Sequence, residues 1–371
     1  MLQNFLKSRL GKRRDENTLR KLTNLSQLTD FTSNDYLGLA RSEDLFRLIQ
    51  KKTEALSHRN GAGGSRLLSG NSAYTEEVEQ KLAAIFHSEA ALIFNSGYAA
   101  NQGVLSSIPQ KGDTILYDEL AHACIRDGAR LSLASRFPFL HNNLNDLEER
   151  LKRAQGNIFI AVESVYSMDG DVCPLSELVI LAEKYNATII LDEAHSTGVF
   201  GKNGAGLAVA RGLEHKIPIR IYTFGKAMGV HGACVAGSRT LIDYLINFSR
   251  TFIFTTAMGS HSIASIDCAF EYLATHLVLQ QQMSDRVKLF NEVSDTLSLQ
   301  KLSSNTQIQG IVIPGNEIIK KVAERLQSTG FDVRPILSPT VAQGSERLRI
   351  CLHTFNSSEE ITELIHQLSK F

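Results

Sequence analysis

The sequence lacks an excess of charge of either sign. Its 371 residues carry 39 Lys and Arg against 39 Asp and Glu. A strong basic excess is typical of proteins that bind nucleic acid or anionic membranes, so neither is expected as a partner here. The 43% apolar and 21% charged content is that of an ordinary globular protein, which excludes a disordered or fibrous chain.

Paired cysteines are also missing. The five cysteines are odd in number and scattered, with no C-x-x-C pair and no Cys/His spacing typical of a metal site. We therefore expect free, mostly buried thiols in a reducing compartment, and no metal ion.

No long apolar run is present. No stretch approaches the roughly 18 uninterrupted apolar residues of a membrane span. The segment Met1–Leu6 has no apolar core long enough for a signal peptide. These absences predict a cytoplasmic protein.

The glycine-rich loop Gly61–Ser65 lacks the G-K-[ST] ending of a phosphate-binding P-loop. No clear strand precedes it, as a dinucleotide-binding fingerprint requires. A nucleotide-binding function is therefore rejected.

Short β-rich runs alternate with segments of helical spacing through the middle of the chain. The expected strands are Ala91–Phe94, Thr114–Tyr117, Ile158–Val162, Thr188–Leu191, Ile219–Thr223 and Ala233–Ala236. This alternation predicts an α/β fold with a mostly parallel sheet flanked by helices. A strand, helix, strand, strand and helix at the end predict a small C-terminal α+β domain.

These patterns divide the chain into three predicted parts. Residues 1–44 form an N-terminal helix and turn segment, 45–285 a large domain, and 286–371 the small domain. A basic amphipathic helix is expected over about 2–21, and a long helical stretch from about Leu241 towards Val287.

The most informative residues follow two of the expected strands. Asp192 ends an aliphatic run and His195 comes three residues later, whereas Lys226 follows a second run and stands between glycine and alanine. Alone, the aspartate is explained by loop capping and the lysine by a surface position. Together they are the groups that hold pyridoxal 5'-phosphate (PLP): a carboxylate for the pyridine nitrogen, an imidazole for the phenolic oxygen, and an amine for the covalent bond.

Further candidates lie near strand ends. Gly97 and Tyr98 open a helix after a strand, where backbone N–H groups bind phosphate, and Thr223 could add a hydroxyl to the same phosphate. His122 is the candidate to stack on the cofactor ring, and Ser167 also lies just past a strand. An ordinary turn, a core histidine and a turn serine are the alternative explanations.

These residues and their surroundings resemble the α-oxoamine synthases, fold-type I PLP enzymes that condense an amino acid with an acyl thioester and release CO2. The matching segments are Ser33–Leu39, Gly63–Gly70, Asn95–Gln102, Ser167–Asp171, Asp192–Gly198, Thr223–Gly229 and Arg347–Ile350. They extend along essentially the whole chain and are highly specific in combination.

The resemblance implies a role for each candidate near the cofactor. Lys226 would hold PLP and take the Cα proton, and Asp192 would pair with the pyridine nitrogen. His195 and Ser167 would approach the phenolic oxygen, and His122 would stack on the ring. Gly97, Tyr98 and Thr223 would bind the phosphate.

The resemblance also implies roles for substrate-binding and partner-facing residues. Thr256 would reach the phosphate of a neighbouring subunit, so a homodimer is expected. Arg349 would bind the amino-acid carboxylate, which suits its forked guanidinium. The residues that would line the substrate access are Arg20, Asn34 and Thr340.

Within the family, Val333–Ile336 and Pro339–Val341 are most similar to the biotin-pathway branch. That branch joins L-alanine to a pimeloyl thioester, carried by coenzyme A or a carrier protein. Three alternatives stay open: a relative that uses glycine or serine, such as 2-amino-3-ketobutyrate CoA ligase; a fold-type I aminotransferase; and a PLP-fold binding protein without activity.

Overall fold

The computed structural model describes residues 1–371 apart from 17, 21, 23–26, 57–58 and 298. It divides into two compact units. The small unit comprises Met1–Ser33, Met168–Gly170 and Asp285–Phe371, and the large unit comprises Asn34–Ser167 and Asp171–Ser284. The domain boundaries predicted at residues 44 and 285 remain predictions. Met1–Ser33 belongs to the same unit as the C-terminal part of the chain. One reason is that strand β1 (Thr29–Asp30) pairs with β10 (Phe331–Asp332).

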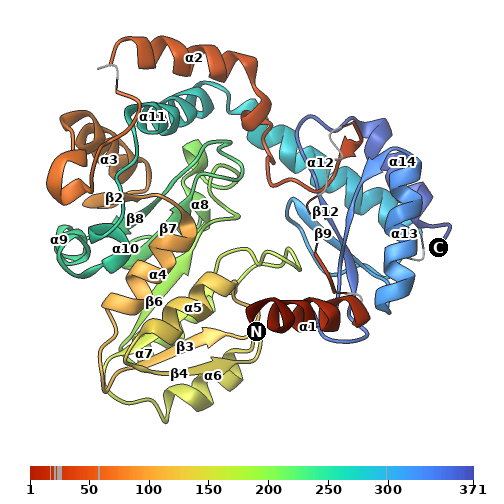
Figure 1. The fold of residues 1–371 in the computed structure, drawn as a ribbon, viewed down its shortest axis with the longest axis horizontal. Coiled ribbons are helices and arrows are strands. Elements are labelled where there is room, and N and C mark those ends of the chain that lie inside the picture. Colours follow the sequence, from red (N-terminus) through yellow and green to blue (C-terminus); the bar gives the residue numbers. More distant parts are fainter. Residues whose placement is uncertain (17, 21, 23–26, 57–58, 298) are drawn as a thin grey trace. The chain divides into compact units, whose positions relative to one another are not determined.

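A seven-stranded sheet forms the centre of the large unit, in the order β2-β8-β7-β6-β5-β3-β4 (Figure 1). Only β8 among these strands runs antiparallel to its neighbours; the remaining pairs are parallel. The strands are β2 (Ala90–Phe94), β3 (Thr114–Asp118), β4 (Ser135–Phe139), β5 (Ile158–Glu163), β6 (Ala187–Asp192), β7 (Ile219–Thr223) and β8 (Ala233–Gly237). The predicted mostly parallel sheet is confirmed.

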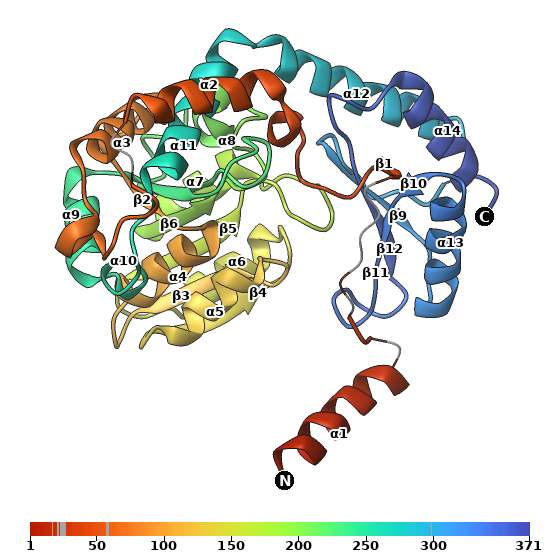
Figure 2. The ribbon, with the colours of Figure 1, turned by 45° about the horizontal axis from the view of Figure 1, so that its top comes forward.

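Helices cover this sheet because their apolar faces need burial. They are α2 (Glu43–Glu54), α3 (Ala73–Ile85), α4 (Gly97–Ser107), α5 (Ala123–Leu131), α6 (Leu144–Leu151), α7 (Leu175–Lys184), α8 (Gly206–Ala210), α9 (Arg239–Phe248), α10 (Arg250–Ile253) and α11 (Ser260–Thr275). Helices α4 and α5 pack side by side against the sheet (Figure 2). Their residues Val104 and Ile125 join Phe94 and Ile221 of the strands in one buried apolar cluster.

The small unit holds an antiparallel sheet in the order β11-β12-β9. Its elements are α1 (Leu2–Asp15), β9 (Ile308–Val312), α13 (Asn316–Ser328), β11 (Arg334–Ile336), β12 (Arg347–Cys351) and α14 (Ser358–Leu368), and α12 (Val278–Asp295) spans the boundary between the units. Helix α14 begins at a capping box in which Ser357 and Glu360 each satisfy the other's backbone N–H. The predicted α+β elements of the tail are confirmed.

Three expectations about elements are wrong. The first helix ends at Asp15 and residues 18–20 are not helical, while Lys21 lies outside the described residues. The long helical stretch after Leu241 is broken into separate helices, because an extended segment before α11 ends at Gly259. Strand β4 was not expected; it pairs only with β3, and this edge position tolerates Pro138.

Candidate active site

The residues predicted around the cofactor follow strands that end at one edge of the large sheet. Asp192 is the last residue of β6 and Thr223 the last residue of β7, and the two strands are parallel. Strand β2 runs the same way as β7 because both are antiparallel to β8, so Gly97 begins α4 at this edge too. Ligands of open α/β sheets bind beyond this carboxyl edge.

The carboxylate of Asp192 is buried and held from two sides. Its Oδ2 accepts a 2.7 Å hydrogen bond from Nδ2 of Asn101, and its Oδ1 accepts one of 2.8 Å from the N–H of Ala194. Asn101 lies on α4, one turn after Gly97, and is itself buried. Sequence reasoning missed Asn101 as a functional residue, although its spacing of four from Gly97 places both on one helix face.

His195 connects Lys226 to Tyr36. Its Nε2 lies 2.7 Å from Nζ of Lys226, and its Nδ1 lies 2.8 Å from the hydroxyl of Tyr36. That hydroxyl donates to Oδ1 of Asn34 at 2.9 Å, so its oxygen accepts from His195. The proton of a neutral imidazole then belongs on Nδ1, which leaves Nε2 to accept from the lysine. Tyr36, buried and missed by sequence reasoning, thereby orients His195.

The start of α4 has the features of a phosphate site. The first N–H groups of a helix have no partner inside the helix, and those of Gly97 and Tyr98 lie in that turn. A Cβ on Gly97 would stand 2.1 Å from Oγ1 of Thr223, so only glycine lets these two elements approach. Nearby, Nδ2 of Asn95 donates to the carbonyl oxygen of Thr256 at 3.0 Å.

His122 is the N-cap residue of α5 and is exposed. Its backbone N–H donates to Oε1 of Glu163 at 2.6 Å, and its Nδ1 accepts from the N–H of Cys124 at 3.2 Å. The protein around the ring removes enough water to lower the pKa of His122, and the charge of Lys226 lowers the pKa further. A neutral, accessible imidazole suits stacking on an aromatic ring.

Glu163 is a second buried carboxylate at this edge, paired in register with Asp192 on the adjacent strand. Burial raises the pKa of Glu163 to about 8, and the charge of Asp192 adds to this effect. Sequence reasoning did not single out Glu163. Its contact with the backbone of His122 gives it a role in holding that turn.

Ser167 follows β5 and is buried in the large unit. Three other predicted residues lie in the small unit. Arg349 is on β12, and its Nη1 donates to Sγ of Cys351 at 2.9 Å. Arg20 and Thr340 line one groove of about 540 Å³. Their predicted roles towards the amino acid and the thioester stay predictions.

The residues of the large unit fit PLP. The N-terminus of α4, which begins at Gly97, can bind the phosphate, and the buried carboxylate of Asp192 can pair with the ring nitrogen. Lys226, held by His195, can bond to the aldehyde carbon. All five cysteines are buried thiols rather than members of disulfides. No helix in the described part of the chain is long and apolar enough to cross a membrane.

Comparison with known proteins agrees with this chemistry. Residues 26–368 match the family described as aminotransferase class I and II. An 8-amino-7-oxononanoate synthase of Emericella nidulans is 41% identical over 99% of this chain and 95% of its own length. A putative 8-amino-7-oxononanoate synthase of Bacillus licheniformis is 40% identical over 98% of this chain and 96% of its own.

Solved structures show the same fold. A serine palmitoyltransferase from S. paucimobilis with a bound PLP–myriocin adduct superimposes with a TM-score of 0.90 at 25% identity, covering 100% of this chain and 98% of that one. The 8-amino-7-oxononanoate synthase from Francisella tularensis gives 0.81 at 28% identity, covering 93% and 98%.

The chain therefore belongs to the aminotransferase class I and II family. It has the fold of the fold-type I PLP transferases and is a PLP-dependent enzyme. The resemblance to the α-oxoamine synthases, close to 8-amino-7-oxononanoate synthase, is confirmed by these relatives.

Proposed function

We propose that this enzyme condenses L-alanine with a pimeloyl thioester, releasing CO2 and the thiol, to give 8-amino-7-oxononanoate for biotin. The observation that carries the proposal is the chain of contacts from Lys226 through His195 to Tyr36 and Asn34, in a protein 41% identical to a synthase of that name. This chain of contacts supports the proposal because the reaction needs an oriented, proton-accepting amine at the cofactor.

The proposed chemistry makes one carbon–carbon bond. Bound PLP supplies an electron sink for the charge that develops on the alanine Cα. The Cα–C bond forms to the acyl carbonyl carbon while the C–S bond breaks and the thiol leaves. The alanine carboxylate then departs as CO2, and a proton returns to Cα.

Residues of the large unit manage the protons and the cofactor in this proposal. Lys226 takes the Cα proton on Nζ, and His195 keeps that atom oriented through Nε2. Asp192, held by Asn101, pairs with the pyridine nitrogen so that the sink stays effective. His122 covers the ring face. The other proposed contacts to the cofactor are Gly97, Tyr98, Thr223 and Ser167.

Residues of the small unit bind the substrates in this proposal. Arg349 holds the amino-acid carboxylate with its planar guanidinium. Arg20 and Thr340, which share one groove, are the proposed contacts of the thioester in this unit. Asn34, a residue of the large unit, is a further proposed contact. We further propose a cytoplasmic homodimer in which Thr256 reaches the phosphate bound by the partner.

The test is to supply the purified enzyme with L-alanine, glycine or L-serine, each with pimeloyl-CoA and with pimeloyl carrier protein. Thiol release and the product mass are measured. Alanine alone should give 8-amino-7-oxononanoate. Turnover of only glycine or serine would assign a different α-oxoamine synthase. Conversion of the amino acid to a keto acid without any thioester would favour an aminotransferase. The faster of the two donors identifies the acyl carrier.

A further inference from the structure

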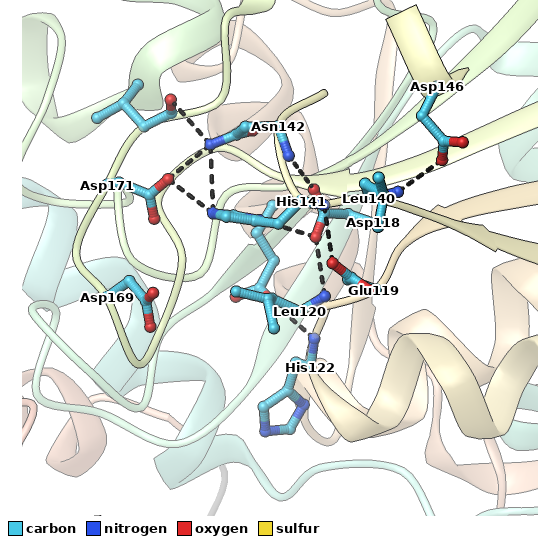
Figure 3. A network of polar contacts seen from close by, with 12 residues as sticks. Asp118, Glu119, Leu120, His122, Leu140, His141, Asn142, Asp146, Asp169 and Asp171 are labelled. Carbon is cyan, nitrogen blue, oxygen red and sulfur yellow. Dashed lines mark hydrogen bonds and ion pairs between the residues drawn. The ribbon is translucent and has the colours of Figure 1, made fainter. Parts of the chain in front are cut away.

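His141 bonds to a carboxylate with each of its two ring nitrogens. Nδ1 lies 2.9 Å from Oδ1 of Asp118, and Nε2 lies 2.8 Å from Oδ2 of Asp171 (Figure 3). Carboxylates only accept, so both nitrogens carry a hydrogen and the ring is a cation. Burial opposes that charge, but the hydrogen bonds to Asp118 and Asp171 raise the pKa of His141 to about 10. The ring also meets Tyr166 edge-on, with centroids 4.5 Å apart.

Asp118 shapes the turn that leads to His122. It is the last residue of β3 and is completely buried. Its Oδ1 accepts from the N–H of Leu120 at 2.8 Å, and its Oδ2 from the N–H of Asn142 at 2.9 Å. This turn runs directly into His122, the N-cap residue of α5 (Figure 3).

Asp171 shapes the turn that carries Ser167. Its carbonyl oxygen accepts from the N–H of Tyr166 at 3.0 Å, and its Oδ2 accepts from Nδ2 of Asn142 at 2.6 Å. Ser167 follows Tyr166 directly. His141 and its neighbour Asn142 therefore both link the His122 turn to the Ser167 turn, and His141 supplies the positive charge between the two carboxylates.

A charged group bonded to two carboxylates is a costly way to obtain stability, because all three groups lose water on burial. Replacement of all three groups together by apolar side chains of similar volume is often neutral or stabilising in proteins. The triad instead imposes directed bonds with fixed lengths on two turns from separate parts of the chain. Both turns end at the carboxyl edge of the sheet, where the cofactor residues lie.

We propose that His141 is a positioning residue, which joins Asp118 to Asp171 and so fixes the His122 turn relative to the Ser167 turn. The proposal rests on the proposed roles of His122 on the ring face and Ser167 at the phenolic oxygen. His141 does not touch the cofactor in this account; it acts through the two turns.

The test compares the His141→Gln variant with two controls. Glutamine cannot supply a cation with two opposed donors. His215→Gln changes an exposed histidine of the large unit, and Leu245→Ala destabilises the buried side of α9, away from the triad. Amide hydrogen exchange of the cofactor-free protein is measured first. Exchange should rise in residues 118–122 and 164–167 in His141→Gln, and in neither control.

The second readout is the visible circular dichroism of bound PLP, which reports the placement of the ring. His141→Gln should change its amplitude, and kcat should fall about 10- to 100-fold, because a displacement of about 1 Å is enough for such a loss. If His141→Gln does not fold, Asp171→Asn is measured in its place. This change neutralises one of the two carboxylates that bind His141, and the site is partly exposed. It should alter exchange and dichroism in the same direction.

Unchanged exchange in both turns, or a loss of activity that follows thermal stability as it does in Leu245→Ala, would overturn the proposal. Exchange and dichroism need no amino acid or thioester. A failure of the proposed substrates would therefore leave this test intact.

Discussion

Nε2 of His195 lies 2.7 Å from Nζ of Lys226. His195 thus orients the amine of Lys226, whose side chain is otherwise flexible. The other ring nitrogen of His195 is hydrogen-bonded to Tyr36. A general base needs this orientation before its pKa matters.

Replacing Tyr36 by phenylalanine should lower kcat. The change removes the hydroxyl that receives the Nδ1 proton, which leaves a buried ring N–H unsatisfied and frees the orientation of His195. A penalty of about 1–3 kcal/mol corresponds to roughly a 5- to 150-fold loss of kcat. Steady-state kinetics with alanine measures it. Tyr185→Phe, which removes a hydroxyl bonded to Glu148, is the control and should behave as the parent. Equal rates in both variants would contradict the role of Tyr36.

Asn101→Ala should weaken catalysis while PLP remains bound. Asp192 would keep its bond to the N–H of Ala194 but lose the donor on Oδ2. We expect a decrease in kcat of about tenfold, from the loss of one hydrogen bond to a charged group. Asn247→Ala removes an exposed amide on α9 and is the matched control. An Asn101→Ala variant that retained the full kcat would contradict a role for the Asn101 hydrogen bond in supporting Asp192.

Gly97→Ala should reduce the affinity for PLP. The added Cβ would stand 2.1 Å from Oγ1 of Thr223, so helix or strand must move at the proposed phosphate site. Overpacking of this kind costs about 1–3 kcal/mol, which corresponds to a dissociation constant roughly 5- to 150-fold larger. Titration of the cofactor-free enzyme with PLP measures it. Gly11→Ala, where the new Cβ meets nothing within 4 Å, should leave the affinity unchanged.

Lys226→Ala should abolish turnover and the absorbance of covalently bound PLP. Borohydride reduction followed by mass spectrometry locates the attachment in the parent protein. A parent labelled at a different lysine would refute the assignment. A variant that kept its turnover would refute it as well.

The contribution of His141 to stability should disappear in alkali. Its pKa in the folded protein, about 10, exceeds the ordinary value of 6.5, so the contribution is complete below about pH 6.5 and is lost as pH rises through about 10. Asp118, Asp171 and Tyr166 face the ring, and Glu119 accepts from the backbone N–H of His141. Urea unfolding of the parent and of His141→Gln should differ most near about pH 6 and converge near about pH 10.5. A constant difference would contradict a titrating cation.

Prediction from the sequence worked where a local pattern carries the information. The apolar pattern of Ile219–Thr223 predicts a strand, and the structure has a strand there. Lys226 therefore follows the end of a buried strand, as predicted. The same pattern placed Asp192. Strand β4 was missed because four of its five residues are exposed and Pro138 interrupts the run, which removes the apolar signal.

The sequence by itself determined the cofactor chemistry. Asp192, His195 and Lys226 follow buried strands, and a residue that follows such a strand must emerge at the sheet edge. Only the tertiary structure decided which groups hold them. Asn101 reaches Asp192 across 91 residues and Tyr36 reaches His195 across 159. Periodicity reports which face of an element is buried, but not which distant side chain that face will meet, because pairing depends on how the elements pack.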